Sequence, residues 1–208
     1  MPVAREAELV ASASGFGARW DASGQIPQRA VPTIGRFGAI DPTEGGNTSR
    51  HDVSLGLRSL PSGHAQWEAR AFATQYRFRL FSNFTFFLND SINGDGSEQV
   101  DDRFLAGFRG SVTRPYTAVG RPATWSAGTG ARLDRADVLL GNQRERERLD
   151  VRVDARIGQD QWFGWTQLRI ELSPRVRLQV GVRADAFRFD VLDQASQDTG
   201  SDAANGSG

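Results

Sequence analysis

The stretch "NDSINGDGSEQVDD" (residues 89–102) holds the densest set of oxygen-bearing side chains in the chain. Such residues bind Ca²⁺ when a closing glutamate completes a loop of fixed spacing. Here Val100 stands at the closing position. The spacing therefore favours a solvated hairpin loop, and an outer loop that binds Ca²⁺ or contacts a substrate is the less favoured alternative.

Catalytic and metal-binding combinations are scarce. The only histidines are His51 and His64, and neither has a second histidine at metal-ligand spacing. The chain has no cysteine, which excludes disulfides and thiolate ligands. Acid pairs such as Asp150 and Asp154 lie in alternating contexts typical of solvated charges, not of acid–base catalysis. We expect no enzyme activity, no metal and no cofactor.

Arginines are the remaining candidates for binding chemistry. All 25 basic residues are arginine, and they balance 25 acidic residues, so net charge gives no argument for nucleic acid as a partner. Forked guanidinium groups suit carboxylates and phosphates. Six arginines are predicted to face a wet interior, where they contact an anionic ligand or another domain, or simply pair with wall carboxylates such as Glu171 and Asp185: Arg77, Arg79, Arg109, Arg132, Arg169 and Arg183.

The elements that carry these residues alternate with a period of two. From Phe72 to Leu88 one face is almost wholly apolar and the other mostly polar, which indicates a long strand. The segment from Leu149 to Ile157 alternates without a break, and the residues on either side of the "SPR" turn predict a tight hairpin. Long polar connections are expected at residues 26–47, 89–102 and 134–148.

Long strands with one apolar face favour an outer-membrane β-barrel, because ordinary strands are only about 5–6 residues long. We predict an all-β, antiparallel meander of about seven long strands that forms part of a transmembrane β-barrel. A soluble β-barrel or sandwich that binds a small ligand remains the alternative, and an enzyme within a small barrel lacks a convincing nucleophile and base. The aromatic residues expected to form girdles at the membrane interfaces are Trp20, Trp67, Phe84, Phe86, Trp125 and Trp165.

Three stretches resemble the barrel of bacterial TonB-dependent outer-membrane receptors. They are "WDASGQIPQRAV...IGRFGAIDPTEGGNTSRHDVSLGLRS", "YRFRLFSNFTFFLND...NGDGSEQVDDR" and "LSPRVRLQVGVRADAFRFDV". The resemblance implies a 22-stranded barrel with an N-terminal plug, which imports scarce nutrients such as ferric siderophores with energy passed through TonB. It also implies contact with lipid in the outer membrane of a Gram-negative bacterium.

The chain departs from that family pattern in two respects. It shows no plug and no TonB box, and about seven strands are too few to close such a barrel. We therefore expect a fragment, with residues 1–192 forming part of the barrel and residues 193–208 forming a flexible polar loop or truncated tail. The missing plug and the remaining strands are the expected partners. The transported ligand cannot be read from these residues.

Overall fold

The computed structural model describes residues 7–22, 24–60 and 65–195. Seven strands account for most of them. Their bounds are β1 Ala7–Asp21, β2 Gly45–Ser59, β3 Gln66–Ser82, β4 Ser97–Ala118, β5 Arg121–Arg144, β6 Glu147–Ser173 and β7 Val176–Asp193. A 3-10 turn (Gln28–Ala30) and the four-residue helix α1 (Val31–Ile34) lie in the connection between β1 and β2.

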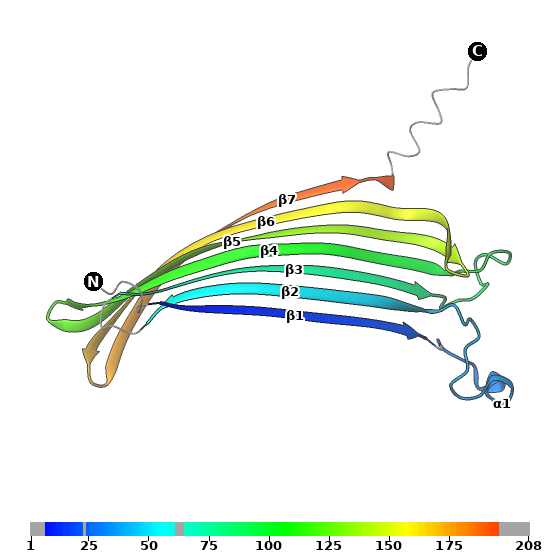
Figure 1. Ribbon diagram of the computed structural model, residues 1–208, viewed down its shortest axis with the longest axis horizontal. Coiled ribbons are helices and arrows are strands. Elements are labelled where there is room, and N and C mark those ends of the chain that lie inside the picture. Colours follow the sequence, from blue (N-terminus) through cyan, green and yellow to red (C-terminus); the bar gives the residue numbers. More distant parts are fainter. Residues whose placement is uncertain (1–6, 23, 61–64, 196–208) are drawn as a thin grey trace, which may run out of the picture.

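The strands form one antiparallel sheet in the order β1-β2-β3-β4-β5-β6-β7, so each strand pairs with its neighbours in sequence. Figure 1 shows them side by side as a single curved layer. They are 15 to 27 residues long, several times the ordinary strand length of about 5–6 residues. The predicted all-β meander of seven long strands is confirmed.

The two ends of the sheet carry different connections. At one end the strands join through short turns, including the two-residue turns at Val119–Gly120 and Pro174–Arg175. Val119 and Gly120 both have positive φ, as the tight turns that match strand twist require. At the other end lie the connection from β1 to β2, which carries α1, and the connection 83–96 from β3 to β4 (Figure 1). We call these ends the short-hairpin end and the long-loop end.

Two expectations about strand ends are wrong. Residues 134–148, expected to form a polar loop, instead belong to β5 and β6 and reverse in a two-residue turn at Glu145–Arg146. Alternation in the third strand was expected to continue to Leu88, but β3 ends at Ser82. Beyond it the side-chain amide of Asn83 donates a hydrogen bond to Asp41 Oδ2 at 2.9 Å, which diverts the chain into a loop.

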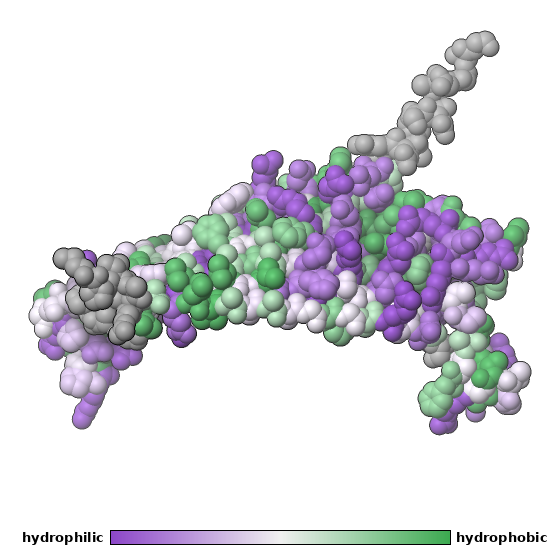
Figure 2. Space-filling model, viewed as in Figure 1, coloured by the Kyte–Doolittle hydropathy of each residue, from purple (hydrophilic) through white to green (hydrophobic). Residues whose placement is uncertain are grey.

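The sheet has almost no apolar interior. Among the described residues only Phe81, Ala123 and Ala136 are buried hydrophobics, whereas most large apolar side chains are exposed. On the surface seen in Figure 2, hydrophobic residues gather toward the short-hairpin end and hydrophilic residues toward the long-loop end. Within the described ranges, no helix is both long enough and apolar enough to cross a membrane. The apolar side chains therefore need a partner outside this sheet.

Candidate functional site: the two faces and the loop end of the sheet

Strand register defines two faces, because residues directly opposite each other across a sheet share a face. One row carries Ala11, Leu55, Ala71, Phe108, Ala131, Trp162 and Ala186. The next row carries Ser12, Ser54, Phe72, Gly107, Arg132, Gln161 and Phe187. We call the side of the first row the band face and the side of the second row the opposite face.

An apolar band crosses the band face on all seven strands. On β5 it runs from Ala123 to Leu133, so it extends about 33 Å along the strand at ~3.3 Å per residue. With the ~40° tilt of barrel strands, this corresponds to about 25 Å along the membrane normal, the height of the apolar belt of outer-membrane barrels. The main members are Leu9, Ala11, Ala13, Val53, Leu55, Leu57, Ala69, Ala71, Ala73, Ala106, Phe108, Val112, Ala127, Ala131, Leu133, Leu168, Ile170, Leu178, Val180, Val182, Ala184 and Ala186.

Aromatic side chains mark both borders of this band. Trp67, Tyr116 and Trp125 lie on the band face near the short-hairpin end. Phe104 and Trp162 lie on the same face where the band gives way to charged rows. Amphipathic rings prefer the boundary between hydrocarbon and water, so two aromatic rows on either side of an apolar band fit a bilayer.

The six predicted girdle aromatics do not lie together. Trp67 and Trp125 are at the short-hairpin border of the band. Trp20 and Trp165 are on the opposite face, where Trp20 packs against Phe78 with ring centroids 6.3 Å apart. Phe84 and Phe86 lie in the loop after β3, and Phe86 has a φ of 59°. Tyr116, Phe104 and Trp162 are not among the predicted girdle residues, although the parity of their positions in each strand places them on the apolar face.

The six predicted arginines also divide between the faces. Register places Arg109, Arg132, Arg169 and Arg183 on the opposite face. Arg77 and Arg79 lie on the band face, beyond the band, where Arg77 is 3.4 Å from Asp102 and Arg79 is 3.2 Å from Glu98. The expectation that all six share one interior face is therefore wrong for Arg77 and Arg79. Tyr76 and Phe78, which belong to the apolar side of the pattern from Phe72 to Leu88, lie on the opposite face.

Contacts of the opposite-face arginines are mostly local. Arg132 lies 3.1 Å from Asp134, and Arg183 lies 2.8 Å from Asp185 with its guanidinium 4.4 Å above the Phe163 ring. Arg169 donates a hydrogen bond to Gln179 at 3.2 Å. Arg109 forms no ion pair or hydrogen bond with any described residue, and it faces Arg70 directly across the β3–β4 pair. Arg132 and Arg183 thus pair with carboxylates of their own strands, whereas Arg169 and Arg109 do not.

Glycines on the opposite face make room for aromatic rings. A Cβ on Gly128 would lie 2.6 Å from Trp165, and one on Gly130 would lie 2.6 Å from Phe163. The two rings therefore lie directly over the glycines of the neighbouring strand, an arrangement that compensates for the missing side chain. This packing explains why Trp165 lies on the wall of the opposite face and not at a border of the band.

Most of the buried side chains lie at the long-loop end, and two more exposed arginines contact them there. We call this group the loop-end cluster: the buried Glu44, Phe81, Asn83, Glu98 and Gln143, with Arg146 and Arg148. Arg146 Nε donates to the Thr43 carbonyl at 2.7 Å, and Arg146 Nη2 lies 3.0 Å from Asp21 Oδ1. Its guanidinium also lies 5.4 Å from the centroid of the Phe81 ring. One turn residue of the β5–β6 hairpin thus joins β1, β3 and the 22–44 connection.

The carboxylates in and beside the loop-end cluster differ in burial and in charged or hydrogen-bonding partners. Burial raises the pKa of Glu44 above its ordinary value, and the charge of Asp41 adds to that rise. The pKa of Asp41 is lowered below its ordinary value. Burial of Asp41 acts to raise this pKa, but the hydrogen bonds from Thr43 and Asn83 to its carboxylate have the larger combined effect. Glu98 is only 3% exposed and is bracketed by Arg79 at 3.2 Å and Arg148 at 2.7 Å. A charge pair on each side offsets the cost of burying Glu98.

The acidic loop after β3 uses its carboxylates on its own backbone. Asp95 accepts hydrogen bonds from the amides of Asn89 and Asp90, and Asp90 accepts from the amides of Ile92 and Asn93. A hydrogen bond from the Thr85 side chain, followed by those backbone bonds, lowers the pKa of Asp95 to about 2. These contacts give the carboxylates of the loop hydrogen-bond partners within its own backbone.

Metal-ligand geometry is absent from the described residues, where no group of three histidine, cysteine or carboxylate side chains converges. His51 lies on β2 opposite Gly15 on the band face. His64, the other histidine considered in the sequence, lies outside the described residues. A cavity of ≈510 Å³ opens between the loops, lined by residues that include Asp41, Asn83, Phe87 and Arg144.

Solved structures with a similar fold are outer-membrane receptors. The chain matches the unliganded ferric citrate transporter FecA with a TM-score of 0.73 and 11% identity, over 92% of this chain and 28% of that one. It matches FpvAI from a complex with pyocin S2 with a TM-score of 0.68 and 10% identity, over 93% and 31% of the two chains. FpvA of P. aeruginosa bound to a heterologous pyoverdine gives 0.60 and 9%, over 93% and 30%.

The chain thus spans less than a third of the length of each of these receptors. No protein-family model matches the sequence, and no curated protein matches it. At about 10% identity the likeness concerns the fold: a seven-stranded meander superimposable on a part of a TonB-dependent receptor barrel.

Proposed function

We propose that this chain forms a sector of the wall of a TonB-dependent receptor in the outer membrane of a Gram-negative bacterium. The band face contacts lipid, and the opposite face lines the lumen. The complete receptor imports a scarce nutrient of the ferric siderophore kind, with a plug domain and the TonB complex as partners. In this role residues 1–192 belong to the barrel, the sector has no enzyme activity, and the residues from 193 onward lead out of it.

The apolar band carries this proposal. Its height of about 25 Å matches the hydrocarbon belt of a barrel, and aromatic residues lie at both of its borders. No element of the described chain covers it, and its members Leu55, Phe108 and Val182 are 52%, 53% and 67% exposed. A soluble barrel or sandwich would need to bury this whole surface against protein.

The sheet edges support a larger barrel. Within the described residues β1 and β7 each pair on one side only, so a row of backbone groups on each is left without a strand partner. Unpaired amides and carbonyls are costly in hydrocarbon, which is why strands span membranes only in closed barrels. Further strands that close the sheet would pair both edges. The similar solved receptors are about three times longer than this chain, which is consistent with such additional strands.

Spin labels on adjacent residues test the orientation. The chain has no cysteine, so Leu55→Cys and Ser54→Cys each supply one labelling site, on the band face and the opposite face. In membranes, the label at position 55 is expected to collide readily with O₂ and poorly with a water-soluble nickel complex, as lipid-exposed labels do. The label at position 54 serves as the matched control and is expected to show no such preference.

The same measurement distinguishes the membrane orientation from the alternative of a soluble β-barrel or sandwich. If the band were buried in a soluble protein, the label at position 55 would be shielded from both O₂ and the nickel complex. High accessibility to the nickel complex at position 55 would mean that the band faces water, which contradicts the proposal.

A further inference from the structure

The arginines at the two borders of the apolar band differ in whether they have carboxylate partners. At the border toward the long-loop end, arginines of the band face lie beside carboxylates of the neighbouring strands. Arg77 lies 3.4 Å from Asp102, and Arg156 lies 2.9 Å from Asp137. Arg135 forms an ion pair with Asp160. These guanidinium groups already have an anionic partner within the protein.

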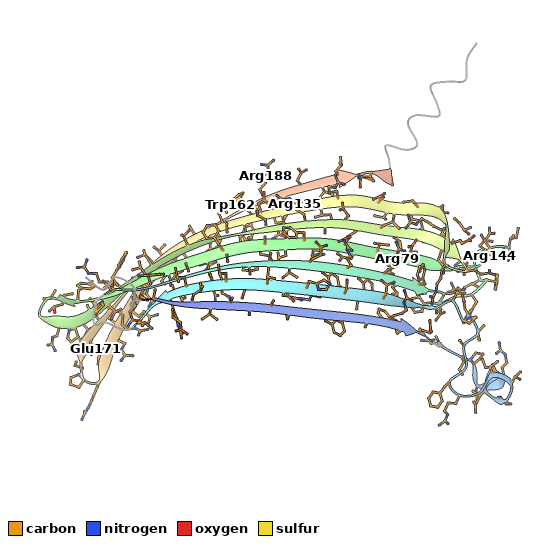
Figure 3. The ribbon with its side chains drawn as sticks, viewed as in Figure 1. Arg79, Arg135, Arg144, Trp162, Glu171 and Arg188 are labelled. Atoms are coloured by element: carbon orange, nitrogen blue, oxygen red, sulfur yellow. The ribbon has the colours of Figure 1, made fainter. Side chains whose placement is uncertain are left out.

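Mixed charge extends through a groove at this border. The groove, of ≈270 Å³, is lined by Arg135, Arg156, Asp160, Arg188 and Asp190, among others. Figure 3 shows Trp162, Arg135 and Arg188 in the middle part of the sheet, away from its short-hairpin end. Arg188 forms no ion pair within the described chain, but two carboxylates share its groove. This border is close to neutral.

Among the described residues of the band face, the border at the short-hairpin end carries arginines without a neighbouring carboxylate. Arg114 lies directly opposite Trp125 on the band face, and Arg121 lies opposite Ala118 on the same face. Neither forms an ion pair or a hydrogen bond with any residue that the structure describes, and both are exposed. The segment from Val112 to Trp125 contains no acidic residue. The nearest carboxylates along this end, Glu68 and Glu171, are on the opposite face.

The surroundings of Arg114 and Arg121 fit an interface position. Tyr116 lies two residues from Arg114 on the same face, so arginine and aromatic side chains alternate at the edge of the band. A long arginine stem rests on apolar surface while its guanidinium reaches water. At this depth the available anions are lipid phosphates, which guanidinium groups bind with paired, charge-assisted hydrogen bonds.

We propose that Arg114 and Arg121 form a binding site for anionic phospholipid headgroups at the short-hairpin border of the band. The opposite border lacks such a site because its arginines are neutralised by Asp102, Asp137 and Asp160. Charge complementarity selects the occupant: two cations without partners among the described residues, four rows apart on the β4–β5 ladder beside Tyr116 and Trp125, recognise phosphodiesters with a net negative charge. This inference rests on the proposed orientation of the band face toward lipid.

Headgroup selectivity at Trp125 tests the site. The protein is reconstituted with Trp125 as its only tryptophan, in vesicles that contain brominated phosphatidylglycerol or brominated phosphatidylcholine at equal mole fraction. Quenching of Trp125 is expected to be greater with the anionic lipid. In the Arg114→Gln/Arg121→Gln double variant the preference is expected to fall by roughly fivefold per arginine at low salt, since each interfacial basic residue contributes about that factor.

A matched control uses the other border. With Trp162 as the only tryptophan and Arg135→Gln as the substitution, quenching by the two lipids is expected to be nearly equal before and after the change. An undiminished preference at Trp125 in the double variant would overturn the proposal, as would an equal anionic preference at Trp162. Absence of quenching by either lipid would instead contradict the membrane orientation itself, so the two proposals fail in distinguishable ways.

Discussion

The apolar band and the loop-end cluster are built on opposite principles within one sheet. In the band, side chains such as Leu55 and Phe108 project from a single layer and are more than half exposed. In the loop-end cluster, Gln143 and Glu98 are 2% and 3% exposed and are held by hydrogen bonds and ion pairs. Polar contacts within the band are few, such as the hydrogen bond from Trp125 Nε1 to Thr166 Oγ1 at 2.9 Å, and the cluster contains one large apolar side chain, Phe81.

The difference reflects what each region has as its surroundings. In the proposed orientation lipid supplies the band with apolar contacts, so the protein needs no second layer there. The cluster lies where the strands extend into water, and water competes for every polar contact. It gains its order by enclosing charges among several chain segments. The following experiments change one region at a time.

A charge placed in the band should produce the largest loss. Leu55→Arg is expected to reduce the free energy of unfolding in vesicles by about 2–4 kcal/mol, the cost of arginine near the middle of the hydrocarbon belt. Denaturant titration of the vesicle-bound protein measures it. Leu105→Arg, on the opposite face near Asp134, is the matched control and should cost much less. Equal losses would mean that the two faces have the same surroundings.

Removal of the Arg146 side chain should have the next largest effect, confined to the long-loop end. Arg146→Ala deletes its bonds to Thr43, Glu44 and Asp21 and its contact with Phe81. Charge-assisted hydrogen bonds of this kind contribute about 2 kcal/mol. Amide hydrogen exchange at residues 41–46 is expected to accelerate, with no change in β3 or β4 across the band.

The last residue of β5 provides the comparison. Arg144 has a single contact, to the Ile92 carbonyl at 3.5 Å, so Arg144→Ala should leave exchange at residues 41–46 unchanged. If both substitutions acted alike, general loosening of the hairpin tip would explain the effect better than the Arg146 bridge.

Acidification should have the smallest effect, limited to the loop after β3. The pKa of Asp95 is about 2, below the ordinary value of 3.8, so its ionised form stabilises the folded loop. That contribution is complete above pH ~4 and is lost as the pH falls toward ~2. The amide NMR signals of Asn89 and Asp90 are expected to shift over this range. In Asp95→Asn that pH-dependent shift should disappear, and its persistence would assign the titration to another carboxylate.

Period-two alternation was sufficient to predict the number and antiparallel order of the strands. It could not assign faces across strands, because a face is shared only through register. Arg77 and Arg109 each lie on the polar side of their own strand's pattern, yet register places them on different sides of the sheet. Beyond the band both faces of a strand meet water, so alternation there no longer distinguishes lipid from lumen.

Two strand ends were mispredicted for related reasons. Polar residues 134–148 suggested a loop, but the strands continue into water, where both faces can be polar. Phe84 and Phe86 continued the alternating pattern, but the bond between Asn83 and Asp41, far apart in sequence, ends β3 before them. Contacts between loops distant in the chain fix these boundaries, and local sequence does not contain them.

The β5–β6 hairpin extends far beyond the apolar band. From Leu133, at the edge of the band, β5 continues to Arg144, about 36 Å further at ~3.3 Å per residue. At its tip, Arg146 forms hydrogen bonds with Thr43, in the connection that carries α1, and with Asp21 of β1. A force applied to α1 or to the tip would therefore reach the band through the β5–β6 pair, whose register shifts at Leu140/Gly141 and at Asn142/Gln143. In the proposed orientation, a large molecule that binds at this tip would change the tilt of the strands within the bilayer.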